Sequence, residues 1–378
     1  MRTSVKSLTA AVAVVTSAVL IAACGSSSGS SGAAAAGDKP FAGQTLIFGG
    51  GQADANESIM GAMAAKFKEE TGADVQFIGG SAPDNLSKLL AAKGRSTPPF
   101  DAVFLDSTTQ PAAAQAGLIQ QVDYKTALQS YSQFPGTGFP TQGYGPGYFL
   151  IRLGTCYNTE VYKQLGLNPP TSLDDWFDPK LQGRVALPDT TNFYWGAAMP
   201  AIAKNYNIPL DDPAALMSKF RDIHAQTLFT SSSDAQQRLQ TGQVAMTTLT
   251  DGRCLALKLA GQPVDLAPVN VVADGKTYPY INFVDTVDIV TGSPKTELAK
   301  KFIDMYTSST ALMPYIQKTG YVPARQDVYA EAKQDPKLAP YYGAFDSATD
   351  LYTPDMTAFL AHQAAWIDAW NNNVKQGG

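Results

Sequence analysis

Short apolar runs alternate with segments of helical spacing along the chain after residue 40. Three such runs predict strands, at residues 44–48, 73–78 and 101–105. Between the first two, Ile59, Met63 and Phe67 recur at four-residue spacing. They follow Asn56, which is suited to cap a helix, and a second helix is predicted near residues 85–93. Strands that alternate with helices predict an open α/β sheet.

A second series of elements begins at residue 148. Residues 148–157 carry apolar or aromatic side chains at both odd and even positions, as expected of a strand covered on both faces. Further strands are predicted at residues 184–187, 242–246 and 280–290. Helices are predicted at residues 192–204, 216–224 and 296–307, and the tail at residues 354–375 is predicted to be one amphipathic helix.

The ends of the three early strands mark one edge of a candidate site. In open α/β sheets, ligands bind beyond the carboxyl ends of the strands, and these ends read GGGQ, GGS and DSTT. They nominate Gln52, Asp106 and Thr108 as ligand contacts. The alternative is ordinary turn chemistry, because a glycine after a strand is usually only a turn. The spacing matches neither a dinucleotide fingerprint nor a phosphate-binding loop.

The N-terminal segment has the pattern of an export signal. A basic start precedes an apolar run at residues 8–23, too short for a comfortable membrane span, which indicates a signal peptide at residues 1–23. The run ends in Ile21-Ala22-Ala23-Cys24, which resembles the lipobox of bacterial lipoproteins and implies lipid modification of Cys24. A flexible tether rich in Gly, Ser and Ala follows at residues 24–40. The alternative is an ordinary cleavage site that happens to precede a cysteine.

Composition narrows the class of protein. With 378 residues, 44% hydrophobic and 16% charged, the chain is typical of a globular protein long enough for two lobes. A net charge of −5 without a Lys/Arg block argues against a nucleic-acid partner. His224 and His362 lie in separate predicted helices without metal-ligand spacing, and no nucleophile motif is present. We therefore expect no metal, no other cofactor and no enzymatic activity.

Two cysteines follow Cys24 in the sequence, Cys156 and Cys254. In an exported protein such a pair forms a disulfide more often than not. Two unrelated buried thiols are the alternative.

The later motifs resemble a known family. The sequence runs from Tyr157-Asn158 through Pro169-Pro170 to a G-x-V-x-x-P-D segment that ends at Asp189. An A-G-x-P-V segment follows at residues 260–264 and a G-Y-x-P turn at residues 320–323. This order is similar to that in extracellular solute-binding proteins of ABC importers, of the spermidine/putrescine-binding type. The resemblance covers nearly all of the chain beyond the tether.

The resemblance implies a type II periplasmic-binding-protein fold, an α/β architecture of two lobes with the ligand cleft at the hinge. Each lobe would be a mixed sheet flanked by helices. One lobe would comprise residues 41–152 and 283–314, and the other residues 153–282 and 315–378 with the C-terminal helix. The family's fold also brings Cys156 near Cys254 within the second lobe, which favours the disulfide.

Part of the family's binding site is kept in this sequence. The strand that returns to the first lobe keeps an aromatic residue and an acid two positions apart, Phe283 and Asp285. The G-Y-x-P turn keeps Tyr321. At the end of the third strand, Asp106 and Thr108 stand where the family supplies hydroxyls and an aromatic. Acids between aromatic rings suit a cation, because carboxylates pair with ammonium groups and ring faces attract positive charge.

Other positions depart from the polyamine-binding pattern. Polyamine binders place an Asp, and three residues later a Glu, where this chain has Thr190 and Phe193, with Asp189 one position early. The position that often carries an aromatic ring is Thr250, followed by Asp251. We keep all five as candidate ligand contacts.

These observations predict a substrate-binding lipoprotein on the outer face of the cell membrane. It would capture a small solute, with a polyamine or another amine or zwitterion favoured, and deliver it as a monomer to the transmembrane subunits of an ABC permease. Alternatives on the same fold are binding of ferric ion, a sugar, thiamine or a phosphonate. A periplasmic enzyme is the alternative from another class.

Overall fold

Two long strands organise the sheet of this protein. They are β4 (Gly147–Asn158) and β11 (Tyr280–Ile289), which pair antiparallel with each other. The computed structural model describes residues 39–51, 54, 57–135, 138–342 and 351–376. The predicted signal peptide, the tether up to residue 38 with Cys24, and Gln52 lie outside the described residues.

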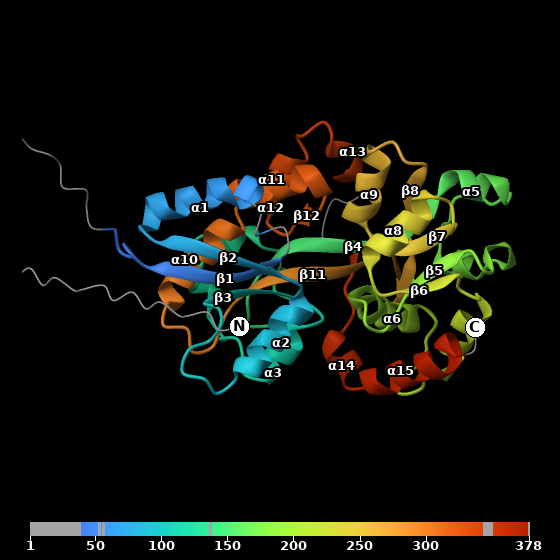
Figure 1. Ribbon diagram of the computed structural model, residues 1–378, viewed down its shortest axis with the longest axis horizontal. Coiled ribbons are helices and arrows are strands. Elements are labelled where there is room, and N and C mark those ends of the chain that lie inside the picture. The colour runs from blue at the N-terminus through green and yellow to red at the C-terminus, as the bar shows by residue number, and fades with distance from the viewer. Residues whose placement is uncertain (1–38, 52–53, 55–56, 136–137, 343–350, 377–378) are drawn as a thin grey trace, which may run out of the picture. The chain divides into compact units, whose positions relative to one another are not determined.

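The first half of the sheet contains three parallel strands: β1 (Thr45–Gly51), β2 (Asp74–Gly80) and β3 (Ala102–Asp106). β3 also pairs antiparallel with the C-terminal part of β11. Helices lie on both sides of this half, with α1 (Glu57–Thr71) on one side and α2 (Ala82–Ala92) and α3 (Gln110–Gln115) on the other (Figure 1). The strand–helix alternation expected from the sequence is confirmed here.

The second half of the sheet contains four shorter strands: β5 (Val185–Pro188), β6 (Thr227–Phe229), β7 (Met246–Thr250) and β8 (Val264–Ala267). β7 and β8 each pair antiparallel with β4, and β5 runs parallel to both β7 and β6. The accompanying helices are α5 (Thr159–Gln164), α6 (Phe193–Asn205), α7 (Ala214–Asp222), α8 (Ser232–Gln240) and α9 (Asp251–Leu259).

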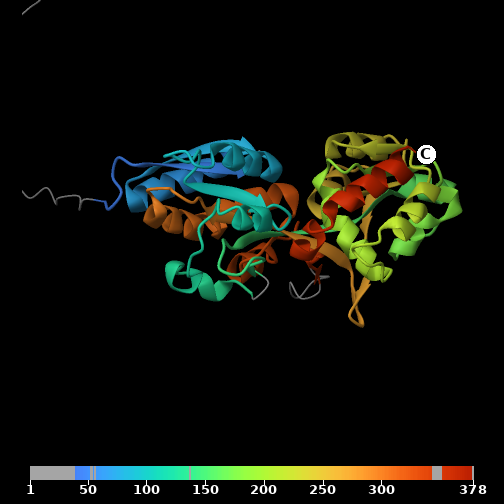
Figure 2. The same ribbon diagram turned by 90° about the horizontal axis from the view of Figure 1, so that it is seen from below.

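β4 belongs to both halves of the sheet. From Gly147 to Leu153 its partner is β11, and from Leu153 to Tyr157 its partner is β7. All of its residues are buried, so the expectation of a strand covered on both faces is confirmed. Figure 2 shows β4 and β11 passing between the two groups of helices. We call the half with β1 to β3 lobe 1 and the half with β5 to β8 lobe 2.

Short elements complete the fold. The remaining strands are β9 (Val271–Ala273) and β10 (Lys276–Tyr278), which form a hairpin, β12 (Val322–Pro323), which pairs with β4, and β13 (Leu351–Tyr352), which pairs with β11. The remaining α-helices are α4 (Tyr124–Ala127), α10 (Thr296–Tyr306), α11 (Ser309–Thr319), α12 (Gln326–Ala332), α13 (Ala339–Tyr342), α14 (Met356–Leu360) and α15 (Gln363–Trp370). Short 3-10 turns are η2 (Tyr131–Gln133), η4 (Leu173–Phe177) and η5 (Pro179–Leu181), and η7 (Asn371–Lys375) is a π-helical turn. The main path of the sheet is β2-β1-β3-β11-β4-β7-β5-β6.

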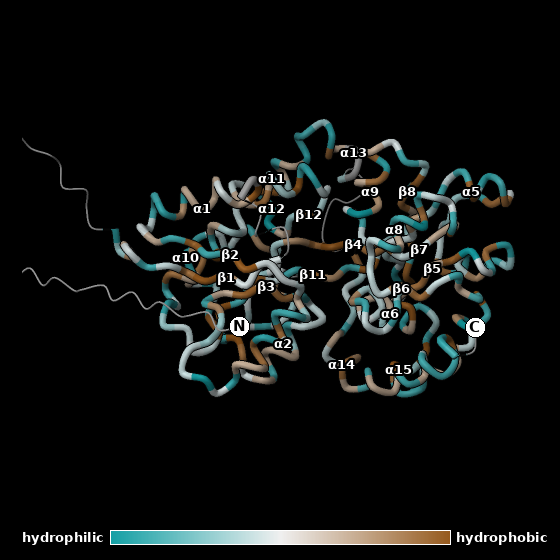
Figure 3. Tube along the Cα trace, viewed as in Figure 1, coloured by the Kyte–Doolittle hydropathy of each residue, from teal (hydrophilic) through white to brown (hydrophobic). Residues whose placement is uncertain are grey.

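The core fills both faces of the sheet. In lobe 1, Phe48 and Phe302 pack on the α1 side with ring centroids 4.9 Å apart. Leu89 and Val103 belong to a separate cluster on the α2 side. Figure 3 shows hydrophobic residues along β1, β4 and β11 and hydrophilic residues on much of the helical exterior.

The strand expected at residues 242–246 lies four residues later, as β7. Gly242 has a positive φ of 70° and turns the chain, which delays the strand. Thr247, Thr248 and Thr250 are buried within β7. Because threonine counts as a polar residue, the pattern of hydrophobic positions does not indicate a strand here.

The tail expected as one helix over residues 354–375 is broken between α14 and α15. The break shifts the buried stripe, so that Phe359 packs on Trp366 with ring centroids 5.5 Å apart. Leu360 and Ile367, which an unbroken helix would turn inward, are only partly buried. The prediction of a single unbroken helix is therefore wrong, although Met356, Trp370 and Val374 of its expected inward face are buried.

Candidate ligand-binding cleft

A cavity of about 170 Å³ lies between lobe 1 and lobe 2. It is small beside sites for drug-sized ligands, which commonly measure about 300 to 1,000 Å³, and so suits a small solute. Its lining residues come from the ends of strands and the starts of helices in both lobes: Gly51, Asp54, Gly80, Ser81, Ala82, Pro83, Phe104, Asp106, Tyr148, Ile151, Phe193, Tyr194, Thr250, Arg253, Phe283, Asp285, Tyr315 and Tyr321.

The cavity brings together six of the residues nominated from the sequence: Asp106, Phe193, Thr250, Phe283, Asp285 and Tyr321. They come from five separate segments, between β3 and the turn before β12. The strand-end rule and the family resemblance thus point to the same place. Their contact with a ligand stays a prediction.

Four other nominated residues do not line the cavity. Thr108 instead contacts a residue of the cavity wall, because its hydroxyl donates to Oδ1 of Asp106 at 2.5 Å. Asp189 pairs with Lys375 at 2.7 Å, and it also accepts the backbone N–H of Thr190 at 2.8 Å.

Asp251 is the fourth nominated residue outside the cavity. Its carboxylate accepts the Nε–H of Arg152 at 2.5 Å, and both side chains are almost completely buried. Breaking such a buried pair is costly because one charge would be left uncompensated. The ion pair joins α9 to β4, and this structural role is enough to explain an acid at position 251.

Asp285 is the acid of the cavity whose carboxylate has no partner among the residues that the structure describes. Within the described residues no hydrogen-bond donor reaches its carboxylate, which is partly exposed toward the cleft. Removal from bulk water raises the pKa of Asp285 well above its usual range, and the negative charges of Asp106 and Asp54 raise it further. A cation in the cavity would relieve both effects.

Asp106 and Asp54 are buried and hydrogen-bonded. Oδ1 of Asp106 accepts the backbone N–H groups of Thr108 and Thr109, each at 2.9 Å, as well as both hydroxyls. Asp54 accepts the backbone N–H of Gly51 and the Tyr306 hydroxyl. Burial raises the pKa of Asp106, and it raises that of Asp54 to about 6, although these hydrogen bonds favour ionisation.

Aromatic rings form much of the remaining wall. Phe193 of α6 meets Phe283 of β11 edge-on, with ring centroids 5.2 Å apart. Tyr315 and Tyr321 stack at 5.9 Å. These aromatic rings offer apolar contact to a small organic ligand, and the faces of the rings attract positive charge.

Tyr321 is held in place by its close approach to α9. A Cβ atom added at Gly252 would come within 2.3 Å of Cε1 of Tyr321, so only glycine fits at this position. The Tyr321 carbonyl oxygen also accepts the Tyr342 hydroxyl. These contacts fix the ring on one side of the cavity.

Six polar or aromatic residues of the cavity wall lie outside both the nominated residues and the strand ends named from the sequence: Asp54, Phe104, Tyr148, Tyr194, Arg253 and Tyr315. Tyr148 and Tyr194 lie within segments predicted as a buried strand and a helix, whose side chains are expected in the core. Arg253 had a usable signal, because it lies in the first turn of a helix that follows a strand next to the nominated Thr250. Positions that follow a strand end are where such sites collect side chains.

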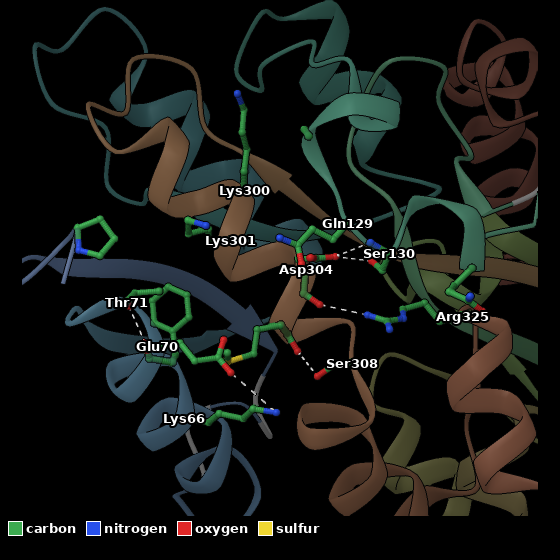
Figure 4. Close-up of a pocket in the computed structure, with 15 residues that line it drawn as sticks. Lys66, Glu70, Thr71, Gln129, Ser130, Lys300, Lys301, Asp304, Ser308 and Arg325 are labelled. Carbon is green, nitrogen blue, oxygen red and sulfur yellow. Dashed lines mark hydrogen bonds and ion pairs between the residues drawn. The ribbon is translucent and has the colours of Figure 1, made fainter. Parts of the chain in front are cut away.

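A larger groove of about 560 Å³ lies outside the cleft, beside α1 and α10 (Figure 4). Several of its charged groups already have partners in the protein. Arg325 donates to the Asp304 carbonyl oxygen at 3.1 Å, and the Asp304 carboxylate accepts the backbone N–H of Ser130 at 3.1 Å. None of the nominated residues lines this groove, so the smaller cavity remains the candidate ligand site.

The cysteine pair lies within lobe 2, next to the site. The structure joins Cys156 of β4 to Cys254 of α9, with Cα atoms 5.8 Å apart. Among the described residues, no cluster of three His, Cys, Asp or Glu side chains is arranged to hold a metal ion.

The fold is shared with solved structures of two-lobed periplasmic binding proteins. An ABC transporter protein from Clostridium perfringens ATCC 13124 is 19% identical, with a TM-score of 0.70, and the match covers 87% of this chain and 99% of that one. A proposed extracellular solute-binding protein from Bordetella parapertussis is also 19% identical, with a TM-score of 0.71 and coverage of 88% and 99%. The Atu4243-GABA receptor is 20% identical, with a TM-score of 0.66 and coverage of 86% and 96%. The predicted two-lobed α/β fold is therefore confirmed.

Fold and cleft thus define a solute-binding protein of the ABC-transporter type. The chain belongs to the bacterial extracellular solute-binding protein family, whose model matches residues 62–340. A comparison with curated protein sequences found no match. Family and fold are those of transport proteins that bind small solutes outside the cytoplasm rather than those of enzymes. In the part of the chain that the structure describes, none of the helices has the length and apolarity that a membrane crossing requires.

Proposed function

We propose that this protein captures a small, positively charged organic solute between its lobes and delivers it to an ABC permease. The observation that carries the proposal is the state of Asp285, a carboxylate in the cleft wall without a hydrogen-bond donor from the described chain. A ligand ammonium group would supply the missing charge and donors in one step.

The surroundings of Asp285 strengthen this proposal. Asp106 and Asp54 line the same cavity and add negative potential, and Phe283, Phe193 and Tyr321 provide the apolar walls. A cation between carboxylates and aromatic faces gains both ion pairing and cation–π attraction. A neutral sugar would leave the Asp285 carboxylate without its counter-charge.

Within the amines, we favour a small molecule over a long polyamine. The cavity measures about 170 Å³. The positions where polyamine binders grip a second ammonium group hold Thr190 and Phe193, and Thr250 stands where a ring would stack on the methylene chain. Each departure removes a contact that a long polycation would need.

We further propose that the mature protein begins at Cys24, is anchored by lipid on the outer face of the cell membrane, and acts as a monomer. The predicted tether would hold the lobes away from the bilayer. Closure of the two lobes on the ligand would then present the loaded form to the permease. The β4 and β11 crossings are the natural hinge because they are shared by both lobes.

A ligand screen tests the solute class. Purified protein is exposed to amines, amino acids, polyamines, sugars, thiamine, phosphonates and ferric ion, and the shift of the melting temperature is measured. Hits are then titrated by calorimetry. We expect the strongest stabilisation from a small solute with an ammonium group. Saturable binding of a solute without positive charge, and none of any amine, would contradict the proposal.

A further inference from the structure

We infer that the ligand carries a negative group as well as its positive one, and that Arg253 binds the negative group. The inference rests on the proposed function, and it narrows the ligand from amines in general to zwitterions with separated charges. Arg253 lies in the first turn of α9 and lines the same cavity as Asp285.

The Arg253 side chain is held by Gln236 and lines the cavity. Its Nη1 donates to Oε1 of Gln236 on α8 at 2.7 Å, and the Gln236 side-chain amide donates back to the Arg253 carbonyl oxygen at 3.3 Å. Within the described residues no carboxylate pairs with this guanidinium. A guanidinium has several further N–H donors in a planar fork that matches a carboxylate or phosphate.

The neighbouring charges show why Arg253 is available. Asp251, two residues earlier in the same turn, is occupied by Arg152 at 2.5 Å and is fully buried. Asp251 therefore satisfies Arg152 rather than Arg253. Arg253 is half-buried, lines the cavity and has no carboxylate partner among the described residues, so it is suited to bind an anionic group of a ligand.

The start of α9 already has a protein carboxylate beside it. Asp251 is the first residue of this helix, and its Oδ1 accepts the Gly252 backbone N–H at 2.8 Å. An acid in this position compensates the positive end of the helix dipole. The inference therefore rests on the Arg253 guanidinium and not on the helix N-terminus.

The two kinds of charge sit on different lobes. Asp285 and Asp106 lie on paired strands at the edge of lobe 1, and Arg253 lies on α9 of lobe 2. Tyr315, which lines the same cavity, is influenced by both kinds of charge: burial raises the pKa of its phenol, Asp54 and Asp285 raise it further, and Arg253 lowers it. A zwitterion would therefore give each lobe one charge to hold, so that ligand binding itself favours closure.

The test compares ligands that differ only in their second charge. Calorimetry measures binding of 4-aminobutanoate, 1,4-diaminobutane and 1-aminobutane, with shorter and longer ω-amino acids to find the best spacing. We expect the best amino acid to bind wild type at least about tenfold more tightly than the amine or diamine of equal length. Arg253→Gln should weaken that amino acid by about tenfold to a hundredfold and leave the monoamine unchanged.

Controls separate this inference from the proposed function. Lys258→Gln removes a positive charge from the same helix, at a residue paired with Asp265 outside the cavity, and should change nothing. Arg253→Lys keeps the charge and should recover part of the affinity. Unchanged affinity for the amino acid in a folded Arg253→Gln variant, or tighter wild-type binding of the diamine, would overturn the inference alone. If Asp285→Asn leaves every amine unaffected, the proposed function fails instead.

Discussion

Asp285 on β11 lies directly opposite Asp106 on β3 in the antiparallel register of the sheet. Side chains at such paired positions lie on the same face and close together, and like charges there destabilise the sheet. Among the described residues, hydrogen-bond donors reach only one of these two carboxylates. Asp106 accepts backbone and hydroxyl donors from Thr108 and Thr109, while Asp285 accepts none within the described residues. The unpaired negative charge of the cleft is therefore concentrated on Asp285.

Asp285→Asn should weaken binding of the cationic ligand and stabilise the free protein. Losing one partner of a desolvated ion pair typically costs about 2 to 5 kcal/mol, which corresponds to about thirty-fold or more in affinity. The same change removes repulsion with Asp106, so the free energy of unfolding should rise, by about 1 kcal/mol. Calorimetric titration with the best ligand and urea unfolding measure the two effects.

Asp212→Asn is the matched control, because Asp212 is exposed at the surface, away from the cavity. It should alter neither affinity nor stability appreciably. A binding site that tolerates Asp285→Asn without loss of affinity would mean that this acid has a structural role only.

Much of the fold could be predicted from the sequence because its pattern is local. β4 was visible as a long apolar run, and the strand–helix alternation of lobe 1 follows from simple periodicity. β7 was misplaced because its interior positions are threonines, which read as polar although the structure buries them. The break between α14 and α15 depends on packing of Phe359 against Trp366, a contact that a regular helical period does not encode.

Only part of the candidate site could be predicted from the sequence, because some of its residues depend on contacts between distant parts of the chain. Asp106 and Asp285 follow rules about strand ends and family motifs, and both line the cavity. Asp251 looked equally suitable, but its buried partner Arg152 is 99 residues away in sequence, and no local pattern reveals such a pair. The position of Arg253 just after a strand end was a usable signal, but only the structure shows that the neighbouring Asp251 is already paired and that Arg253 lines the cavity.

Mass spectrometry of the non-reduced mature protein should find Cys156 linked to Cys254. A sequence separation of 98 residues makes the cross-link effective, since closing a loop of this length contributes roughly 4 to 5 kcal/mol in the chain-entropy model. Replacing both cysteines by serine should therefore lower the melting temperature, and a reductant should lower that of wild type but not of the double variant. Detection of two free thiols in freshly exported protein would refute the bond.

Cys24→Ala should release the protein from the membrane. The predicted lipid is attached at Cys24, and substitution leaves no acceptor for it. Cell fractionation followed by immunoblotting measures the distribution between the membrane and soluble fractions. The Ser26→Ala variant, changed two residues further along the predicted tether, should remain in the membrane fraction. Wild-type protein that is equally soluble, or an N-terminus found downstream of Cys24, would contradict the anchor.

The ligand-free protein should become less stable as the pH rises from about 4 to about 6. Burial raises the pKa of Asp54 and of Asp288 to about 6, from an ordinary value of 3.8. Between these values the folded state holds protons that the unfolded chain has released, so the free energy of unfolding falls as pH increases. Each group contributes roughly 3 kcal/mol at most by this linkage. Above about pH 6 their effect is complete.

Asp54→Asn separates this effect from other titrations. Both described hydrogen bonds of the Asp54 carboxylate reach the same oxygen, Oδ2, so the amide oxygen of asparagine can accept them in its place. The variant should therefore fold normally and show a smaller loss of stability between pH 4 and 6, measured by urea unfolding at closely spaced pH values.

The affinity for the cationic ligand should change with pH in the opposite direction to the stability. The ligand needs ionised Asp285, and because the pKa of Asp285 is raised, protons compete with the ligand for this carboxylate. Its affinity should rise with pH through that pKa, and a flat or falling affinity would rule out competition between ligand and proton at Asp285.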